Sequence, residues 1–133
     1  MYLNNLNNDE KNSFIELAKF ISEVDGVTSF EEILVINQYL REMGFNEDFK
    51  FQFKSLDEII KSFEYSSLKN KKIVLFEMLV LVYSDNKFCR REEEVINLLV
   101  ESFNINKEDY KELVDLTNGI SLNLKKVSKV IFE

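Results

Sequence analysis

The chain has 133 residues, of which 45% are hydrophobic and 31% are charged, and this is the composition of an ordinary globular protein. A chain of this length buries a full core without help from a metal or a disulfide, so we expect one domain over residues 1–133. Its 17 basic and 24 acidic residues give a net charge of −7. This balance argues against binding to nucleic acid or to anionic lipid.

The scarcity of turn-forming residues favours an all-α fold. The chain has no Pro and only three Gly, which leaves little material for the tight turns of a β-sandwich or barrel. Its single Cys forms no internal disulfide, and no basic, apolar leader opens the chain, so we expect a cytoplasmic protein. The longest apolar run, residues 73–83, has about half of the roughly 20 residues of a membrane span. It predicts a core helix rather than insertion into a membrane.

Residues 1–45 predict a frayed lead-in and then two helices. The first eight residues are rich in Asn and weakly apolar. From Asp9 onward, apolar residues recur at steps of three and four as far as residue 24, which is typical of an amphipathic helix. Gly26 ends this helix. Ser29 and Glu32 form an S-x-x-E capping box that opens a second helix, which Gly44 ends.

The middle of the chain contains its least regular segment and its most apolar one. Three Phe alternate with polar residues over 49–53, but a lone strand would have no partner, so we expect a short helix or turn whose aromatic rings fill the bundle. Ser55 then caps a short connecting helix. Residues 73–83 are apolar except for Glu77. This pattern predicts a central helix, although its β-branched residues would also allow a strand.

The last third of the chain predicts three further helices. Apolar residues over 95–103 form one stripe, and Asn106 caps a helix that extends to residue 116. Asn118 and Gly119 predict a break. Residues 122–132 then form a final short helix or, alternatively, an extended tail.

A skeleton of one Asp, a tight turn and a Glu seven residues later occurs twice. Asp25 with Glu32 and Asp85 with Glu92 are the two copies, sixty positions apart, and an apolar helical stretch flanks each copy on both sides. The chain therefore divides into two helix-turn-helix units, over about residues 9–45 and 67–105.

These motifs resemble the TerB-like family, small all-helical domains named for a tellurite-resistance protein and also found beside a membrane-linked DnaJ-type co-chaperone. The resemblance covers most of the chain, from about residue 14 to 113, and includes the apolar stretch around Glu77. Two positions depart from the family pattern, because Asn86 replaces the usual Gly and Cys89 the usual Ser or Thr. The resemblance implies a bundle of about seven helices, a non-enzymatic role in stress response, and divalent-metal binding through acidic residues.

The acidic pairs have two interpretations. Asp25 with Glu32, and Asp85 with Glu92, would face each other across a turn and offer Ca²⁺, Mg²⁺ or Mn²⁺ an oxygen-rich site. Neither pair belongs to an EF-hand, because the oxygen ligands that alternate along an EF-hand loop are missing here. In the structural interpretation each Asp accepts backbone N–H groups of its turn and each Glu completes a capping box.

Three other features have a functional and a structural interpretation. Glu77 is either a further ligand or proton-responsive group, or a charge that is exposed or paired with a Lys or Arg. Cys89 lies where a helix N-terminus and two Arg would lower its pKa, but it has no second Cys to resolve an oxidised thiol, so a capping role is favoured. The Phe residues at 45, 49, 51, 53 and 63 indicate core, or a partner surface where they are exposed.

No catalytic motif is present. The chain has no His, no nucleophile placed beside a base, and no phosphate-binding loop. We therefore expect a non-enzymatic stress-response domain that binds a divalent cation and acts through protein partners. The alternative is a structural interaction module whose acids only cap helices, and a hydrolase that uses these acids is a distant third. The sequence leaves the oligomeric state open.

Overall fold

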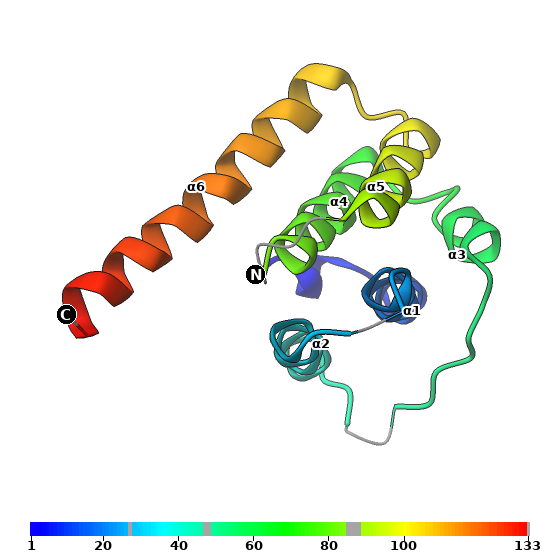
Figure 1. The fold of residues 1–133 in the computed structure, drawn as a ribbon. Coiled ribbons are helices and arrows are strands. Elements are labelled where there is room, and N and C mark those ends of the chain that lie inside the picture. The colour runs from blue at the N-terminus through cyan, green and yellow to red at the C-terminus, as the bar shows by residue number, and fades with distance from the viewer. Residues whose placement is uncertain (27, 47–48, 85–88, 133) are drawn as a thin grey trace.

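The computed structural model describes residues 1–26, 28–46, 49–84 and 89–132, and these residues form helices and connecting segments without strands. The elements are a 3-10 turn η1 (Leu3–Asn5) and six α-helices: α1 (Asn8–Glu23), α2 (Phe30–Glu42), α3 (Leu56–Ser62), α4 (Leu68–Val82), α5 (Arg90–Ser102) and α6 (Lys107–Phe132). Figure 1 shows the first five helices gathered into a bundle, from which α6 extends. The predicted all-α class is confirmed.

Side-chain caps fix where the helices begin. Ser29 accepts the N–H of Glu32 at 3.1 Å, and Glu32 accepts the N–H of Ser29 at 3.0 Å, which completes the predicted capping box. Ser55 and Asn106 also cap the helices that follow them, as predicted. Gly26 and Gly44 have φ values of +90° and +78° after α1 and α2. Gly takes this left-handed conformation at little cost, so the sequence located both helix ends.

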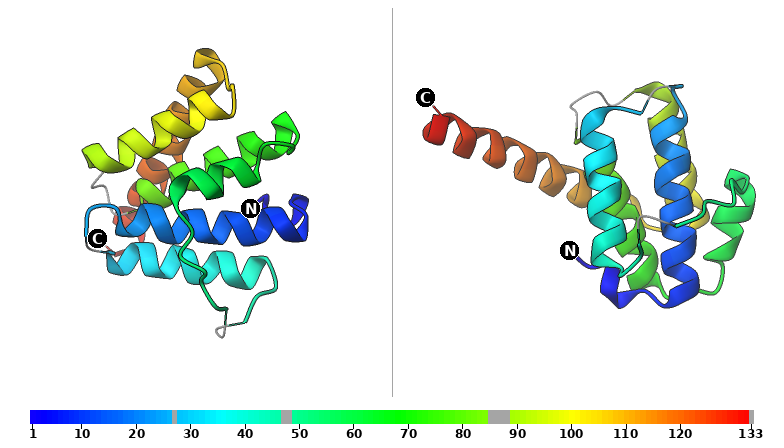
Figure 2. Two further views of the ribbon diagram at one scale, coloured as in Figure 1. Left: turned by 90° about the vertical axis from the view of Figure 1, so that its right-hand side faces the viewer. Right: turned by 90° about the horizontal axis from the view of Figure 1, so that it is seen from below.

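α4 is the central helix, as its apolar pattern predicted. It contacts α1, α2, α5, α6 and η1, and Figure 2 shows it between the α1–α2 pair and α5. Six of its apolar residues are fully buried: Val74, Leu75, Met78, Leu79, Leu81 and Val82. Burial of one such side chain stabilises the fold by roughly 1.5–3 kcal/mol, so this helix contributes a large share of the core.

The N-terminal segment is not frayed, contrary to our expectation. Leu3 is fully buried in η1, Leu6 is nearly so, and the ring of Tyr2 packs edge-on against Phe76 of α4 at 6.0 Å. Two apolar side chains among the Asn residues suffice to dock this segment, because α2 and α4 together offer it a surface. The low hydrophobicity of the segment as a whole concealed them.

The aromatic segment forms neither a helix nor a strand over residues 49–55. The ring of Phe49 contacts the rings of Phe45 and Phe51, with centroid distances of 5.0 and 5.1 Å. All three rings are partly buried against the core. Phe53 is 74% exposed. The expected short helix is therefore absent from residues 49–55, whereas a turn-type hydrogen bond from the N–H of Phe49 to the carbonyl of Asn46 at 3.1 Å precedes them, and Phe49 and Phe51 cover the bundle as expected. Phe63, after α3, is fully buried against Phe103.

The predicted break at Asn118 and Gly119 is also wrong. α6 passes through both residues, and the whole helix, from Lys107 to Phe132, has 26 residues. A Gly inside a helix costs about 1 kcal/mol relative to Ala, which is too little to end a helix with strong formers on both sides. The count of about seven helices and the two repeat units are therefore not confirmed.

Candidate functional site

The first candidate site lies between the turn after α1 and the start of α5. Asp25 follows the last residues of α1 and is exposed, whereas Cys89 is the N-cap of α5 and Glu92 is its third residue. A carboxylate oxygen of Asp25, the Sγ of Cys89 and a carboxylate oxygen of Glu92 lie within 4.8 Å of one another. The fold thus brings an acid of the first turn to an acid and a thiol that follow the second.

This grouping crosses the two predicted acidic pairs. Asp25 and Glu92 belong to different turns, and they are 67 positions apart in the sequence. Glu32 is not a member of the group, although it has the same capping role in α2 that Glu92 has in α5. Asp85 lies outside the described residues, so its pairing with Glu92 stays a prediction.

Glu92 is only 3% exposed, because its side chain folds back over the first turn of α5. Its Oε1 accepts the N–H of Cys89 at 3.3 Å, and the Sγ of Cys89 accepts the N–H of Glu92 at 3.4 Å. The unsatisfied N–H groups of a helix start attract negative charge, which favours a carboxylate here. A cation would have to bind through the other oxygen of Glu92, since Oε1 is used by the cap.

Arginine side chains supply competing positive charge beside the group. Arg91 donates from Nη1 to the carbonyl of Val24 at 3.3 Å, which ties α5 to the end of α1 next to Asp25. Arg90 pairs with Glu94 on the exposed surface at 3.5 Å. The Arg91 contact already joins the two turns, so a cation bound at Asp25 would add to an existing connection.

The thiol differs from the reactive cysteine considered above. Burial raises the pKa of Cys89 above its ordinary value, and the charge of Glu92 adds to this effect, while backbone N–H groups oppose it. The expectation of a lowered pKa is therefore wrong. The helix start and neighbouring Arg residues are outweighed by desolvation and by a carboxylate that the linear sequence did not place beside the thiol. At neutral pH a thiol of this kind is protonated and reacts slowly.

Glu77 lies elsewhere in the fold. It is 1% exposed on α4, and its Oε1 accepts the ammonium group of Met1 at 3.2 Å and the N–H of Tyr2 at 3.4 Å. The same ammonium group pairs with Glu42 at 2.9 Å. Neither surface exposure nor a pair with Lys or Arg describes this residue correctly. No local pattern indicated that the N-terminal amine would be its partner.

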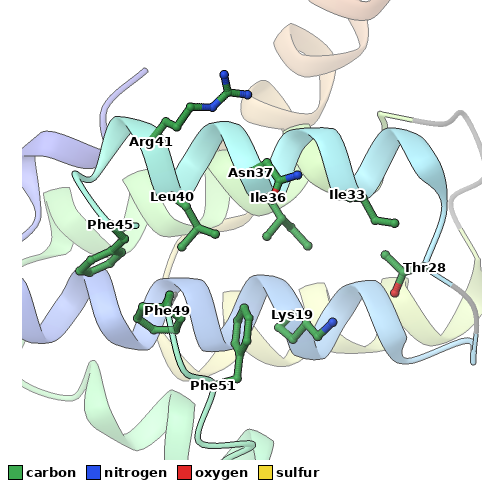
Figure 3. A pocket seen from close by; sticks show the side chains of 10 residues that line it. All are labelled: Lys19, Thr28, Ile33, Ile36, Asn37, Leu40, Arg41, Phe45, Phe49 and Phe51. Carbon is green, nitrogen blue, oxygen red and sulfur yellow. The ribbon is translucent and has the colours of Figure 1, made fainter. Parts of the chain in front are cut away.

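A second candidate site is a groove of about 560 Å³ between α1 and α2, lined by apolar and polar side chains. Figure 3 shows Ile33, Ile36 and Leu40 of α2 pointing toward α1, with Phe45 and Phe49 near one end of the groove. Lys19 and Arg41 are the charged residues of its lining. Such a surface suits an apolar partner segment that carries acidic residues.

Comparisons of this chain with protein-family models, with curated proteins and with solved structures give no match. Within the described residues, no helix combines the length and the apolar character that crossing a membrane requires.

Proposed function

We propose that this chain is a non-enzymatic helical domain that binds a divalent cation between its two turns and acts through a protein partner. The observation that supports this function best is the convergence of Asp25, Cys89 and Glu92 within 4.8 Å. Three potential ligands from two separate parts of the chain suit a role as a clamp. A cation held there would link the end of α1 to the start of α5.

The chemistry of the three residues limits the choice of ion. Two carboxylates suit Ca²⁺, Mg²⁺ or Mn²⁺, whereas a thiolate suits Zn²⁺. The raised pKa of Cys89 opposes thiolate formation, because a bound metal would first have to displace the proton. We therefore favour an ion held by Asp25 and Glu92, with Cys89 acting as the cap of α5. The resemblance to the TerB-like family adds support for metal binding and for a stress-response role of the tellurite-resistance type.

A thermal-shift titration with Ca²⁺, Mg²⁺, Mn²⁺ and Zn²⁺ tests this function. An ion that binds only the folded chain adds about 2.7 kcal/mol of stability at a hundred times its dissociation constant. The rise should be saturable, absent in Asp25→Asn, and retained in Asp115→Asn, which removes an exposed acid of α6. Cys89→Ser should abolish the Zn²⁺ response only if the thiol is a ligand.

The absence of a shift at millimolar concentrations of all four ions would contradict cation binding. An equal response in Asp25→Asn and in the wild-type chain would place the ion elsewhere.

The alternative function is a structural interaction module in which the acids only cap helices. Complete capping boxes at Glu32 and Glu92 account for both residues without a ligand. The groove between α1 and α2 would then bind the partner. Fluorescence polarisation with an acidic amphipathic helical peptide tests this function: Ile33→Glu in the groove should abolish binding, whereas Phe30→Glu, on α2 but outside the groove lining, should not. Equal loss in both variants, or no binding, would contradict it.

A further inference from the structure

The C-terminal half of α6 carries an apolar face that the bundle does not cover. Figures 1 and 2 show this half running away from the other helices. Leu124, Val127 and Ile131 are 63%, 52% and 65% exposed, although apolar side chains usually avoid water when they form a continuous stripe. A stripe of this kind on a projecting helix indicates a contact with another molecule.

The exposed stripe continues an interface that is already formed within the chain. Tyr110, Leu113, Thr117, Ile120, Leu124, Val127 and Ile131 follow one another at alternating steps of three and four residues, and we call this row the α6 seam. Its first part packs on the bundle, where Thr117 is buried and Leu113 is partly buried, and α6 contacts α4 there. Steps of three and four are the pattern by which two helices pack along each other. The second part of the seam therefore has the geometry to receive another helix.

We propose that the second part of the α6 seam binds the same part of a second copy of this chain, with the two helices antiparallel. The positions beside the seam carry no charge in this half: they are Ser121, Asn123, Ser128 and Val130. Like charges at such positions would repel an identical helix. Their absence removes the usual obstacle to self-association.

The second part of the α6 seam consists of Ile120, Leu124, Val127 and Ile131, and the antiparallel arrangement gives each of these residues a partner. Pairing Leu124 with Val127 of the partner subunit also sets Ile120 opposite Ile131 of the partner subunit, because both pairs are centred on the same point of the helix. A twofold axis through that point produces each contact twice, as in an isologous dimer.

A groove at the base of the projecting half would receive the end of the partner helix. It has a volume of about 470 Å³ and is lined by residues of α2, α4 and α6, including Val35, Val80, Thr117 and Ile120. Since Ile131 of the partner subunit lies opposite Ile120, its neighbour Phe132 would reach this groove. Phe132 is 83% exposed in the single chain and would become covered. The dimer would thus bury more than the seam alone.

Charge also favours a second copy over other partners. Residues 116–132 contain Lys125, Lys126 and Lys129 and no acidic residue, which is a charge of +3. Since the net charge of the chain is −7, its other residues together carry −10. Burial and then the charge of Glu93 raise the pKa of Tyr83, one of the groove residues, so Glu93 lies near the groove of the partner subunit, whose lining also contains Lys125. A basic helix end is thereby brought to an acidic bundle.

A membrane surface fits this helix less well. The Lys residues and the seam do lie on opposite faces, as in helices that bind to lipid headgroups. However, the first part of the same seam packs on α4, so the bundle stands on the side to which the exposed part faces. The bundle would keep a flat bilayer from contacting the whole exposed part of the seam, whereas a second helix is narrow enough to pack along it.

Sedimentation velocity of the full chain over a micromolar concentration series tests the dimer. The wild-type chain should form dimers, and Leu124→Glu should raise the dissociation constant about a hundredfold, because the change occurs twice and each lost anchor is worth about tenfold. Leu122→Glu is the matched control, since Leu122 is 54% exposed on the same helix but outside the seam. A monomeric wild-type chain would overturn the proposal, whether or not it binds vesicles containing phosphatidylserine. Equal weakening by both variants would overturn it as well.

Disulfide trapping tests the direction of pairing. In a Cys89→Ser background, Leu124→Cys and Val127→Cys are made as two separate single-cysteine chains, which are mixed and oxidised, and the linked peptides of the covalent dimers are identified by mass. The antiparallel dimer predicts links between position 124 of one copy and position 127 of the other. Links of 124 to 124 would show parallel helices and overturn the proposed arrangement.

Discussion

The two capping boxes that open α2 and α5 differ in one atom, and this difference leads to a prediction about stability. Ser29 caps α2 with an oxygen, whereas Cys89 caps α5 with a sulfur. The N–H of Glu32 lies 3.1 Å from the Oγ of Ser29, and the N–H of Glu92 lies 3.4 Å from the Sγ of Cys89. Sulfur is the weaker acceptor, so the α5 cap contributes less to stability.

We expect Cys89→Ser to stabilise the fold. A serine cap is worth about 1 kcal/mol relative to a residue that cannot cap, and the sulfur already supplies part of this. The substitution should therefore raise the free energy of unfolding by about 0.5 kcal/mol. For a chain of this size the corresponding rise in melting temperature is about 2 °C. The reverse change, Ser29→Cys, should lower stability by a similar amount, since the rest of the box is unchanged.

Urea unfolding followed by circular dichroism, with both variants measured beside the wild-type chain, provides the test. Opposite shifts of the two midpoints at an unchanged slope would confirm that the caps differ as their geometry indicates. If Cys89→Ser were neutral or destabilising while Ser29→Cys was destabilising, the sulfur at position 89 would contribute through packing or a ligand. Two neutral variants would show that neither cap contributes measurably, and the reasoning would fail.

Two further predictions concern the interior of α6 and the buried charge of α4. Gly119→Ala should raise the free energy of unfolding by up to about 1 kcal/mol, because the site is helical and nothing lies within 4 Å of an added Cβ; thermal unfolding measures this, and a loss would indicate a break in the helix. Glu77→Gln should cost roughly 1 kcal/mol at pH 7, a value reduced because the Met1 ammonium group is largely exposed. Burial alone lowers the pKa of that ammonium group, but Glu42 and Glu77 raise it above 8.0, so the pair stabilises fully below pH 8 and its contribution is lost as the pH rises through the raised pKa. Stability measured from pH 7 to pH 10 should fall more in the wild-type chain than in Glu77→Gln, and parallel curves would contradict the ion pair.

Local signals in the sequence predicted the helices and most of their starts. The caps at Ser29, Ser55 and Asn106 depend on residues three positions apart, and Gly26 and Gly44 end helices through their own backbone freedom. These interactions are contained in a few consecutive residues, so a single sequence is enough to find them.

Local signals misled where their energies were small. The Gly of the Asn118–Gly119 pair costs a helix about 1 kcal/mol, and the helix formers on both sides outweigh it. The alternating Phe residues over 49–53 indicated a compact element, but the chain there forms no regular element, with Phe49 and Phe51 on the core and Phe53 in solvent. Leu3 and Leu6 show the same limit, because a docking surface on distant helices decides whether two apolar residues are buried.

The sequence by itself determined that this protein is helical, where most of its helices start, and that Asp25, Glu32 and Glu92 lie at turns and caps. Only the tertiary structure decided which of these residues meet: Asp25 joins Cys89 and Glu92, and Glu77 joins Met1. It also decided that part of the α6 seam is covered and part is exposed. The physical reason is that caps and helical periodicity are short-range interactions, whereas these neighbours depend on how helices far apart in the chain pack around α4.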